Sequence, residues 1–196
     1  MNQNNIQSIL KGNSIIPVVT FNKIEEIDTV IKNLKNQNIH CIEVTLRTSI
    51  AFNAIKYIKD KYATEICVGA GTVINHEQIK KLEELNVDFI VSPAISKKLI
   101  KELIKTTIPF INGVSTPSEI LLGMEEGCKI FKFFPANLSG GIPALKTYKN
   151  IFPNVTFCPT GGINKSTYKK YLQLENVVSV GGSWMITVSK NLKKIY

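Results

Sequence analysis

Short apolar runs recur along the chain, and amphipathic stretches separate them. The runs are rich in valine, isoleucine and phenylalanine, and each begins roughly 20–26 residues after the one before it. Such runs are typical of parallel strands that are buried on both faces. The sequence therefore predicts eight strands, at Ile15–Val19, Cys41–Thr45, Ile66–Ala70, Phe89–Ser92, Pro109–Val114, Ile130–Phe134, Val155–Pro159 and Val177–Val180.

The stretches between the runs carry apolar residues three and four positions apart. This spacing places them on one face of a helix, which is the face that packs against a sheet. Thr116-Pro117 precedes one of these stretches, and this pair is typical of a helix start. Helices are predicted at Glu25–Leu34, Glu77–Leu85, Ser96–Ile104 and Ser118–Gly123.

A strand followed by a helix, repeated along the chain, predicts a parallel α/β sheet. Right-handed crossovers close such a sheet into a TIM (β/α)8 barrel. We expect one compact barrel domain over residues 1–196, with no linker and no second domain. Because only Met185–Tyr196 remain after the last run and the Gly181–Trp184 segment behind it, the final helix is expected to be short or missing. Active sites of these barrels lie at the carboxyl ends of the strands.

Composition narrows the functional classes. The net charge of +9 suits an anionic substrate and also suits nucleic acid. The lysines are spread along the chain and the aromatic residues are not interleaved with them, so nucleic-acid binding is disfavoured. No run approaches the roughly 20 apolar residues of a membrane span, and residues 1–5 lack a signal-peptide pattern. We therefore expect a cytoplasmic protein without membrane attachment.

The sequence offers no metal or cofactor motif. Its four cysteines form no CxxC pair, and we expect them to be buried and reduced rather than in disulfides or a metal site. No cluster of His, Asp or Glu with metal-ligand spacing stands at the strand ends, and no GxGxxG follows the first run. Neither a metal nor a cofactor is therefore predicted. The cysteines are Cys41, Cys67, Cys128 and Cys158.

A lysine interrupts the apolar run at residues 130–134. Side chains alternate along a strand, so Lys132 shares a face with Ile130 and Phe134. A buried ammonium is costly and responds with a lowered pKa, which makes the amine available as a nucleophile. A lysine that reaches the barrel rim, or that pairs with an acid, is the structural alternative.

A glutamate interrupts the run at residues 41–45 in the same way. Ile42 and Val44 form the aliphatic face that suits packing against helices, which leaves Glu43 pointing into the barrel. Inside one barrel, Glu43 and Lys132 form either a structural ion pair or a proton shuttle beside an amine nucleophile.

Several strand ends carry residues that suit an acidic substrate. Arg47 follows the second run, and its planar fork binds both oxygens of a carboxylate. Thr72, after a glycine-rich strand end, offers a hydroxyl to the same carboxylate. Pro93 follows the fourth run and either shapes a pocket wall or merely ends the strand.

The last two runs end in glycine pairs. Gly161 and Gly162 follow the seventh run, and Gly181-Gly182 with Ser183 follow the eighth. Barrels frequently bind phosphate with the loops after these two strands, where glycine lets backbone N–H groups point at an anion. Simple turns are the structural alternative. Together with the amine, the acid and the arginine, the pairs predict a phosphorylated 2-keto acid as substrate.

Five segments resemble the 2-keto-3-deoxy-6-phosphogluconate (KDPG) aldolase family, which includes 4-hydroxy-2-oxoglutarate aldolases. The match runs in order and at matching spacing from about Ile15 to Trp184. The segments are Ile42–Thr48, Val68–Val73, Phe131–Ala136, Phe157–Ile163 and Gly181–Trp184.

The resemblance implies a class I aldolase, a lyase that cleaves KDPG to pyruvate and glyceraldehyde 3-phosphate. It also implies a homotrimer, although members usually carry a longer final helix than this chain. Matching positions make Lys132 the Schiff-base lysine and Glu43 the general acid/base. The other implied roles are carboxylate binding by Arg47 and Thr72, pocket lining by Pro93, Phe134 and Thr160, and phosphate binding by Gly161, Gly162, Gly182 and Ser183.

Other activities stay open at this point. The galactonate epimer of KDPG and the unphosphorylated 4-hydroxy-2-oxoglutarate are alternative substrates. A different phosphate-binding barrel enzyme, such as an epimerase or a synthase that uses thiazole phosphate, would need no imine. A non-catalytic sugar-phosphate sensor would bind KDPG without turning it over.

Overall fold

The computed structural model describes residues 3–186, which contain eight strands. Every hydrogen-bonded pair of neighbouring strands is parallel. The strands are β1 Ile15–Val19, β2 Cys41–Thr45, β3 Cys67–Gly71, β4 Phe89–Val91, β5 Phe110–Val114, β6 Ile130–Phe133, β7 Thr156–Pro159 and β8 Val180–Gly182.

The sheet closes on itself. Its strand order is β7-β6-β5-β4-β3-β2-β1-β8, so each strand neighbours the next along the chain, and β8 returns to β1. Isolated parallel bridges from Phe157 to Val177 and from Thr160 to Gly181 join the two remaining edges. The predicted TIM barrel is therefore confirmed.

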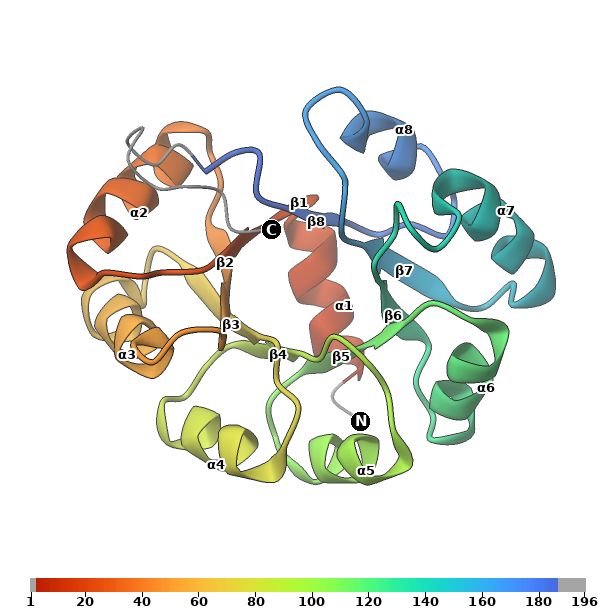
Figure 1. Cartoon of the computed structure of the whole chain (residues 1–196), viewed down its shortest axis with the longest axis horizontal. Coiled ribbons are helices and arrows are strands. Elements are labelled where there is room, and N and C mark those ends of the chain that lie inside the picture. The colour runs from red at the N-terminus through yellow and green to blue at the C-terminus, as the bar shows by residue number, and fades with distance from the viewer. Residues whose placement is uncertain (1–2, 187–196) are drawn as a thin grey trace.

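Helices surround the barrel and alternate with its strands (Figure 1). The four helices predicted from periodicity are all present, with ends shifted by one or two residues. The helical segments are α1 Gln3–Gly12, η1 Ile24–Glu26 (a 3-10 turn), α2 Ile27–Asn36, α3 Ala51–Tyr62, α4 His76–Glu84, α5 Lys97–Lys105, α6 Pro117–Glu125, α7 Gly141–Ile151 and α8 Tyr168–Leu172.

Helix starts follow local chemistry. The side chains of Asn75 and Ser96 cap α4 and α5 by accepting a hydrogen bond from a backbone N–H in the first turn. At α6, Thr116 and Glu119 form a reciprocal capping box, and Pro117 occupies the first turn. These caps set where each helix begins, and hence how long each loop above the barrel is.

Successive side chains of β2 point alternately toward the helices and into the barrel, so they belong to two different hydrophobic cores. Ile42 and Val44 pack outward against the helices, whereas Cys41 packs inside the barrel. Glu43 lies between the two outward-facing residues in sequence, so its side chain points into the barrel. This orientation agrees with the one expected from the sequence.

The same alternation holds on β6. Phe131 and Phe133 pack outward in the helix-facing core, and Ile130 packs inside the barrel. Lys132 therefore also points inward. Strands β2 and β6 lie on opposite sides of the ring (Figure 1). Their inward-facing glutamate and lysine therefore share one interior.

Helix α1, which the sequence analysis did not foresee, lies across the middle of the ring (Figure 1). Its apolar side chains Ile6 and Leu10 are fully buried against inward-facing residues of the strands. We call this cluster the inner floor. Its members are Ile6, Leu10, Ile16, Cys41, Phe89, Val91, Ile111, Ile130 and Cys158.

The predicted position of the last strand was wrong. The run Val177–Val180 was expected to be the strand, with the following glycines in a turn. Instead, β8 begins at Val180 and includes Gly181 and Gly182, which pair with Ile16 and Pro17 of β1. Glycine reads as a turn signal in sequence, but the pairing with β1 holds these two residues extended. The expected short or missing final helix lies outside residues 3–186.

Candidate active site

A buried ion pair occupies the upper interior of the barrel. Lys132 Nζ donates a hydrogen bond to Glu43 Oε1 over 3.1 Å, and each residue is 3% exposed. Gly71 on β3 makes room for the carboxylate, because a Cβ at that position would lie 2.1 Å from Glu43 Oε1. An acid, an amine and a glycine that admits the acid therefore come from three different strands.

Besides the Glu43 carboxylate, two uncharged groups lie near the ammonium of Lys132. Its ammonium lies 5.1 Å from the centroid of the Phe134 ring. Cys158 on β7 is its register partner, and burial raises the pKa of the Cys158 thiol to about 11. The thiol is therefore neutral at pH 7, which leaves Glu43 as the carboxylate that pairs with the amine.

Arg47 and Thr72 meet at the mouth of the barrel. Arg47 Nε donates a hydrogen bond to Thr72 Oγ1 over 3.0 Å. The backbone of Thr72 has φ 63°, a left-handed value that is rare for a β-branched residue and that costs free energy. Strained residues of this kind concentrate at functional sites. The exposed guanidinium keeps donors free for a ligand carboxylate.

The two glycine loops lie side by side. The bridge between Thr160 and Gly181 joins them, and a Cβ at Gly181 would lie 2.3 Å from Thr160 Oγ1. Gly161 and Gly162 have φ values of 100° and 72°, which side chains disfavour. Within residues 3–186, neither glycine N–H has a hydrogen-bond acceptor. These donors are therefore available to an anion.

The second loop is held by aromatic packing. Trp184 stacks on Tyr168 with ring centroids 5.5 Å apart. A Cβ at Gly182 would lie 2.0 Å from the Trp184 ring, so only glycine fits there. Ser183 lies between them in sequence and is exposed. The candidate phosphate site thus opens to solvent beside a rigid aromatic support.

The remaining predicted pocket residues occupy distinct places. Phe134 is half-buried beside Lys132, and Thr160 is buried beneath the glycine loops. Pro93 follows β4, and its carbonyl carbon lies 2.3 Å from where a Cβ of Gly113 would stand. Gly113 is in turn the β5 register partner of Lys132. The structure therefore places all three just beyond the carboxyl ends of β4, β6 and β7, with Phe134 next to the amine.

Two threonines were missed by the sequence analysis. Thr45 is fully buried at the end of β2, and its side chain points inward. Its Oγ1 lies 2.7 Å from Oγ1 of Thr20, the exposed residue that follows β1. The hydroxyl pair extends the polar lining toward β8. A polar residue two positions beyond Glu43, on the same face of the strand, was the available signal.

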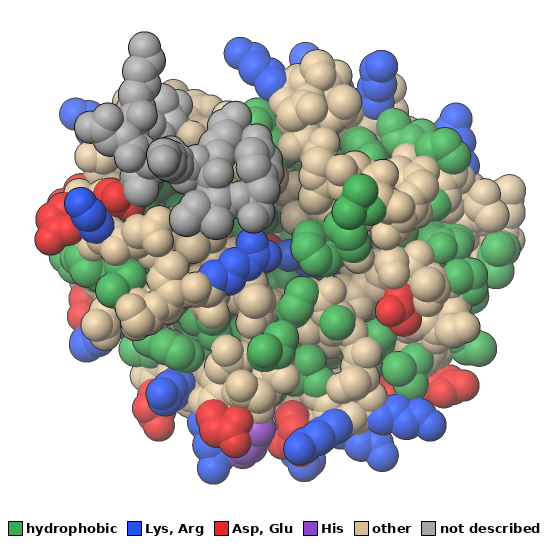
Figure 2. Space-filling model, viewed as in Figure 1, with side chains coloured by type: hydrophobic (Ala, Val, Ile, Leu, Met, Phe, Trp, Pro, Cys, Tyr) green, Lys and Arg blue, Asp and Glu red, His purple; other side chains and the backbone are tan. Residues whose placement is uncertain are grey.

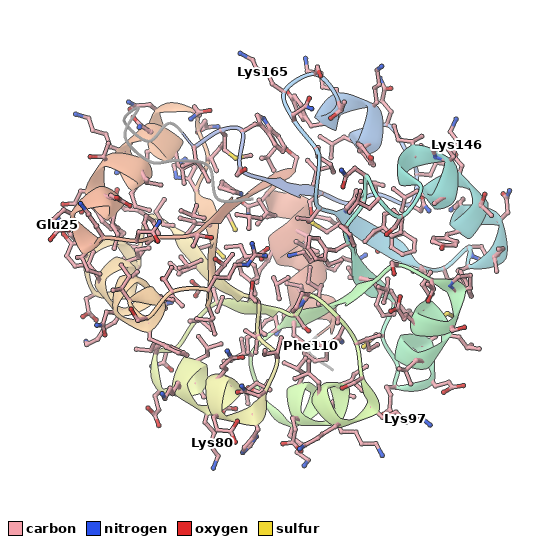
Figure 3. All side chains as sticks on the ribbon, in the orientation of Figure 1. Glu25, Lys80, Lys97, Phe110, Lys146 and Lys165 are labelled. Atoms are coloured by element: carbon pink, nitrogen blue, oxygen red, sulfur yellow. The ribbon has the colours of Figure 1, made fainter. Side chains whose placement is uncertain are left out.

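Charge is not spread evenly around the site. Basic side chains lie near the centre of the face seen in Figure 2, with hydrophobic side chains around them. By contrast, Lys80, Lys97, Lys146 and Lys165 lie on the outer rim (Figure 3). These four lysines therefore belong to a solvated outer surface, whereas other basic side chains lie near the centre of this face.

Residues 3–186 contain no group of three His, Cys, Asp or Glu side chains placed to hold a metal ion. In the same part of the chain, no helix is long and apolar enough to cross a membrane. All four cysteines are free. Three are buried as expected, whereas Cys67 is half-buried because it opens β3 at the rim.

Residues 6–196 match the family model described as "KDPG and KHG aldolase". The chain belongs to the KDPG and KHG aldolase family. It is 43% identical over 180 residues to the KHG/KDPG aldolase of Escherichia coli strain K12, an alignment that covers 92% of this chain and 84% of that protein. The resemblance predicted from five segments is thereby confirmed, as is an enzyme of the lyase class.

Solved structures of KDPG aldolases have the same fold. One from Legionella pneumophila holds pyruvate captured at low pH as a covalent carbinolamine intermediate. It has a TM-score of 0.88 and 40% identity, and covers 91% of this chain and 86% of that one. A second, from Zymomonas mobilis ZM4 with 3-phosphoglycerate, has a TM-score of 0.91 and 35% identity, and covers 96% and 89%.

Proposed function

We propose that this KDPG/KHG aldolase family member cleaves KDPG to pyruvate and glyceraldehyde 3-phosphate through a Schiff base on Lys132. The observation that carries the proposal is the buried pair of Lys132 and Glu43, 3.1 Å apart inside the barrel. A carbinolamine is the first covalent product of an amine and a ketone, and a relative at 40% identity holds one with pyruvate. Cleavage of 4-hydroxy-2-oxoglutarate to pyruvate and glyoxylate is part of the proposal.

The mechanism begins with proton transfer. A free lysine is neutral in only about one molecule in 10³ at pH 7, so the amine needs a nearby base. Glu43 takes the proton from Lys132 and the neutral amine attacks the C2 ketone. Glu43 then returns a proton as water leaves the carbinolamine. The resulting iminium withdraws electrons from the adjacent carbon chain.

The C3–C4 bond breaks because the iminium withdraws electrons from it. Glu43, or a water that it holds, removes the proton of the C4 hydroxyl. The C3–C4 bond breaks, its electrons enter the iminium to form an enamine, and the aldehyde leaves. The enamine is then protonated at C3 and hydrolysed, which releases pyruvate and restores Lys132.

The remaining residues hold the two ends of the substrate. Arg47 and Thr72 bind the carboxylate next to C2, because the guanidinium fork fits two oxygens. The backbone donors of Gly161, Gly162 and Gly182, together with Ser183, bind the phosphate on the far end. This arrangement aligns the C2 ketone with Lys132.

The test is reductive trapping with pyruvate and borohydride, followed by tryptic peptide mass spectrometry. A reduced adduct on Lys132 blocks cleavage there and yields one peptide spanning residues 130–146 in place of two. Lys129→Arg is the matched control, since Lys129 is an exposed lysine three residues away. We expect the adduct in the wild type and in this control, and none in Lys132→Arg.

Turnover distinguishes an enzyme from a sensor. A coupled assay for pyruvate release from KDPG should show activity in the wild type and none in Lys132→Arg, because arginine stays protonated. Substantial residual activity in that variant would refute the imine mechanism. An adduct on Lys132 without turnover of KDPG or 4-hydroxy-2-oxoglutarate would refute the substrate assignment alone.

We further propose a homotrimer, as the family resemblance implies, and a cytoplasmic location, as the sequence analysis predicts. Two large apolar side chains, Leu138 at 80% exposed and Ile74 at 58% exposed, follow β6 and β3 and offer surface for subunit contact. Sedimentation equilibrium should give three times the monomer mass of 21.8 kDa. A concentration-independent monomer mass would contradict the trimer and leave the aldolase proposal intact.

A further inference from the structure

Two cysteines face each other at the lower rim of the barrel. Cys41 begins β2 and Cys67 begins β3, and the two are register partners in the parallel sheet. Neighbouring strands lie roughly 4.8 Å apart, which is within the Cα separation of about 4.4–6.8 Å that disulfides span. Cys41 belongs to the inner floor and Cys67 packs against the same cluster, so both side chains lie on the inner face of the sheet.

The two thiols differ in their access to solvent. Cys41 is 0% exposed and belongs to the inner floor. Cys67 is half-buried and lines a cavity of about 410 Å³ between α1 and the loop that enters β3. A small reagent therefore reaches Cys67 first, and Cys41 stands directly behind it.

The direction in which the pKa of Cys41 is shifted supports this difference between the two thiols. The Cys67 thiol and burial, together with the nearby charges of Glu43 and Asp88, raise the pKa of Cys41. Cys41 is therefore the neutral partner, and Cys67 is the sulfur that meets an incoming reagent. Neither residue takes part in the proposed aldolase chemistry.

We propose that Cys41 and Cys67 form a dithiol site that a hydroperoxide oxidises to a cross-strand disulfide. The Cys67 thiolate attacks the peroxide, the O–O bond breaks, and Cys67 sulfenic acid forms as an alkoxide or hydroxide leaves. The Cys41 sulfur then attacks the sulfenic sulfur, the S–O bond breaks, and water leaves with the Cys41 proton. The two electrons lost by the two thiols reduce the peroxide, and a dithiol reductant reverses the reaction.

The other cysteines lack this arrangement. Cys158 has Lys132 as its register partner on one side, and Cys128 lies outside the strands in the helix-facing core. They serve as internal controls in the same molecule. Trypsin places the four cysteines on four separate peptides, at residues 36–47, 62–80, 106–129 and 150–165.

The experiment treats the folded full-length protein with hydrogen peroxide, blocks free thiols and maps non-reduced tryptic peptides. We expect peptide 36–47 linked to peptide 62–80, a loss of the link on treatment with dithiothreitol, and faster linking as the pH rises, because the thiolate is the nucleophile. Cys128→Ala should leave the link unchanged. In Cys41→Ala, dimedone should capture a sulfenic acid on Cys67.

Two results would overturn the site. One is recovery of both peptides with free, alkylated thiols from folded wild-type protein after peroxide. The other is linkage of Cys41 or Cys67 to Cys128 or Cys158 in comparable yield. The wild-type map needs no substitution, so a variant that fails to fold leaves the test decisive. The peptide map does not measure aldolase activity, so its outcome is independent of the proposed function.

Discussion

The two halves of the barrel interior differ in almost every physical respect, although the same strands build both. On β2, Cys41 packs in the inner floor and Glu43 forms an ion pair. On β6, Ile130 and Lys132 divide in the same way. Two residues along a strand is a distance of roughly 7 Å. On each of these strands, one residue thus packs in the apolar floor that stabilises the fold, and the residue two positions later belongs to the proposed catalytic pair.

The difference also reflects what fills each half. The floor is completed by α1, whose Ile6 and Leu10 are fully buried in it. The upper half has no such plug within residues 3–186, and polar groups line it instead. Apolar burial stabilises the fold, whereas a buried ion pair contributes little net stability because its desolvation offsets its attraction. Substitutions in the two halves should therefore affect different measurements.

The largest expected effect is on catalysis by the upper half. Glu43→Gln keeps the shape of the side chain and removes its ability to accept a proton. We expect kcat to fall roughly 10²- to 10⁴-fold, the usual contribution of general acid–base catalysis. Steady-state pyruvate release measures it, with circular dichroism to verify folding. A near-wild-type kcat would remove Glu43 from the mechanism.

The next effect is on the stability of the lower half. Leu10→Ala should lower the free energy of unfolding by about 2–5 kcal/mol, because it leaves a cavity in the floor. The kcat of the folded fraction should stay unchanged. Urea denaturation measures the first and initial rates the second. Leu121→Ala, at a position 51% exposed on α6, is the control and should change stability by under about 0.5 kcal/mol.

A smaller effect is expected at the barrel mouth. Arg47→Lys removes the planar fork and the hydrogen bond to Thr72 while it keeps the charge. Hydrogen bonds to charged groups contribute about 1.5–3 kcal/mol, so KM should rise roughly 10- to 150-fold. Titration of initial rates with substrate separates KM from kcat. An unchanged KM would exclude Arg47 from carboxylate binding.

The smallest effect concerns Cys158, which lies where the two halves meet. Burial raises its pKa to about 11 in the folded protein, against an ordinary value of about 8.5. Its neutral thiol therefore favours folding fully below about pH 8.5, and this contribution is lost as the pH rises toward 11. The slope is at most about 1.4 kcal/mol per pH unit.

Urea titrations between pH 8 and 11 measure that slope. Cys158→Ala should flatten the fall of the unfolding free energy with pH, whatever its effect on stability at pH 7. Equal slopes for wild type and variant would show that the thiol ionises equally in the folded and unfolded chains.

The barrel, its strands and the central pair could be predicted from the sequence because each rests on a local rule. Alternation alone placed Glu43 and Lys132 in the interior, and periodicity placed four helices. Helix α1 was not predicted because residues 1–5 are polar, and the two apolar residues that follow them and are buried, Ile6 and Leu10, form too short a pattern. The start of β8 was missed because its glycines resemble a turn until β1 pairs with them.

Other parts of the site depend on contacts between distant segments. The left-handed backbone of Thr72, the fit of Gly71 around Glu43 and the hydroxyl pair of Thr20 and Thr45 all arise only after strands are brought together. No local pattern encodes them. The glycine loops were predicted to bind phosphate because TIM barrels often use the same two positions for this purpose, not because their own residues determine a ligand. This part stays a prediction.

Helix α1 also affects the route by which water reaches Lys132. Among residues 3–186, α1 packs across one end of the barrel, so we expect solvent and substrate to approach Lys132 from the other end. If the glycine loops bind the substrate phosphate as proposed, we expect the bound ester to hinder the entry of water while the carbon–carbon bond breaks, and its departure to readmit the water that hydrolyses the imine. In D₂O, exchange of deuterium into the pyruvate methyl group should slow when glycerol 3-phosphate occupies the entrance, and an unaffected rate would show a second path for solvent.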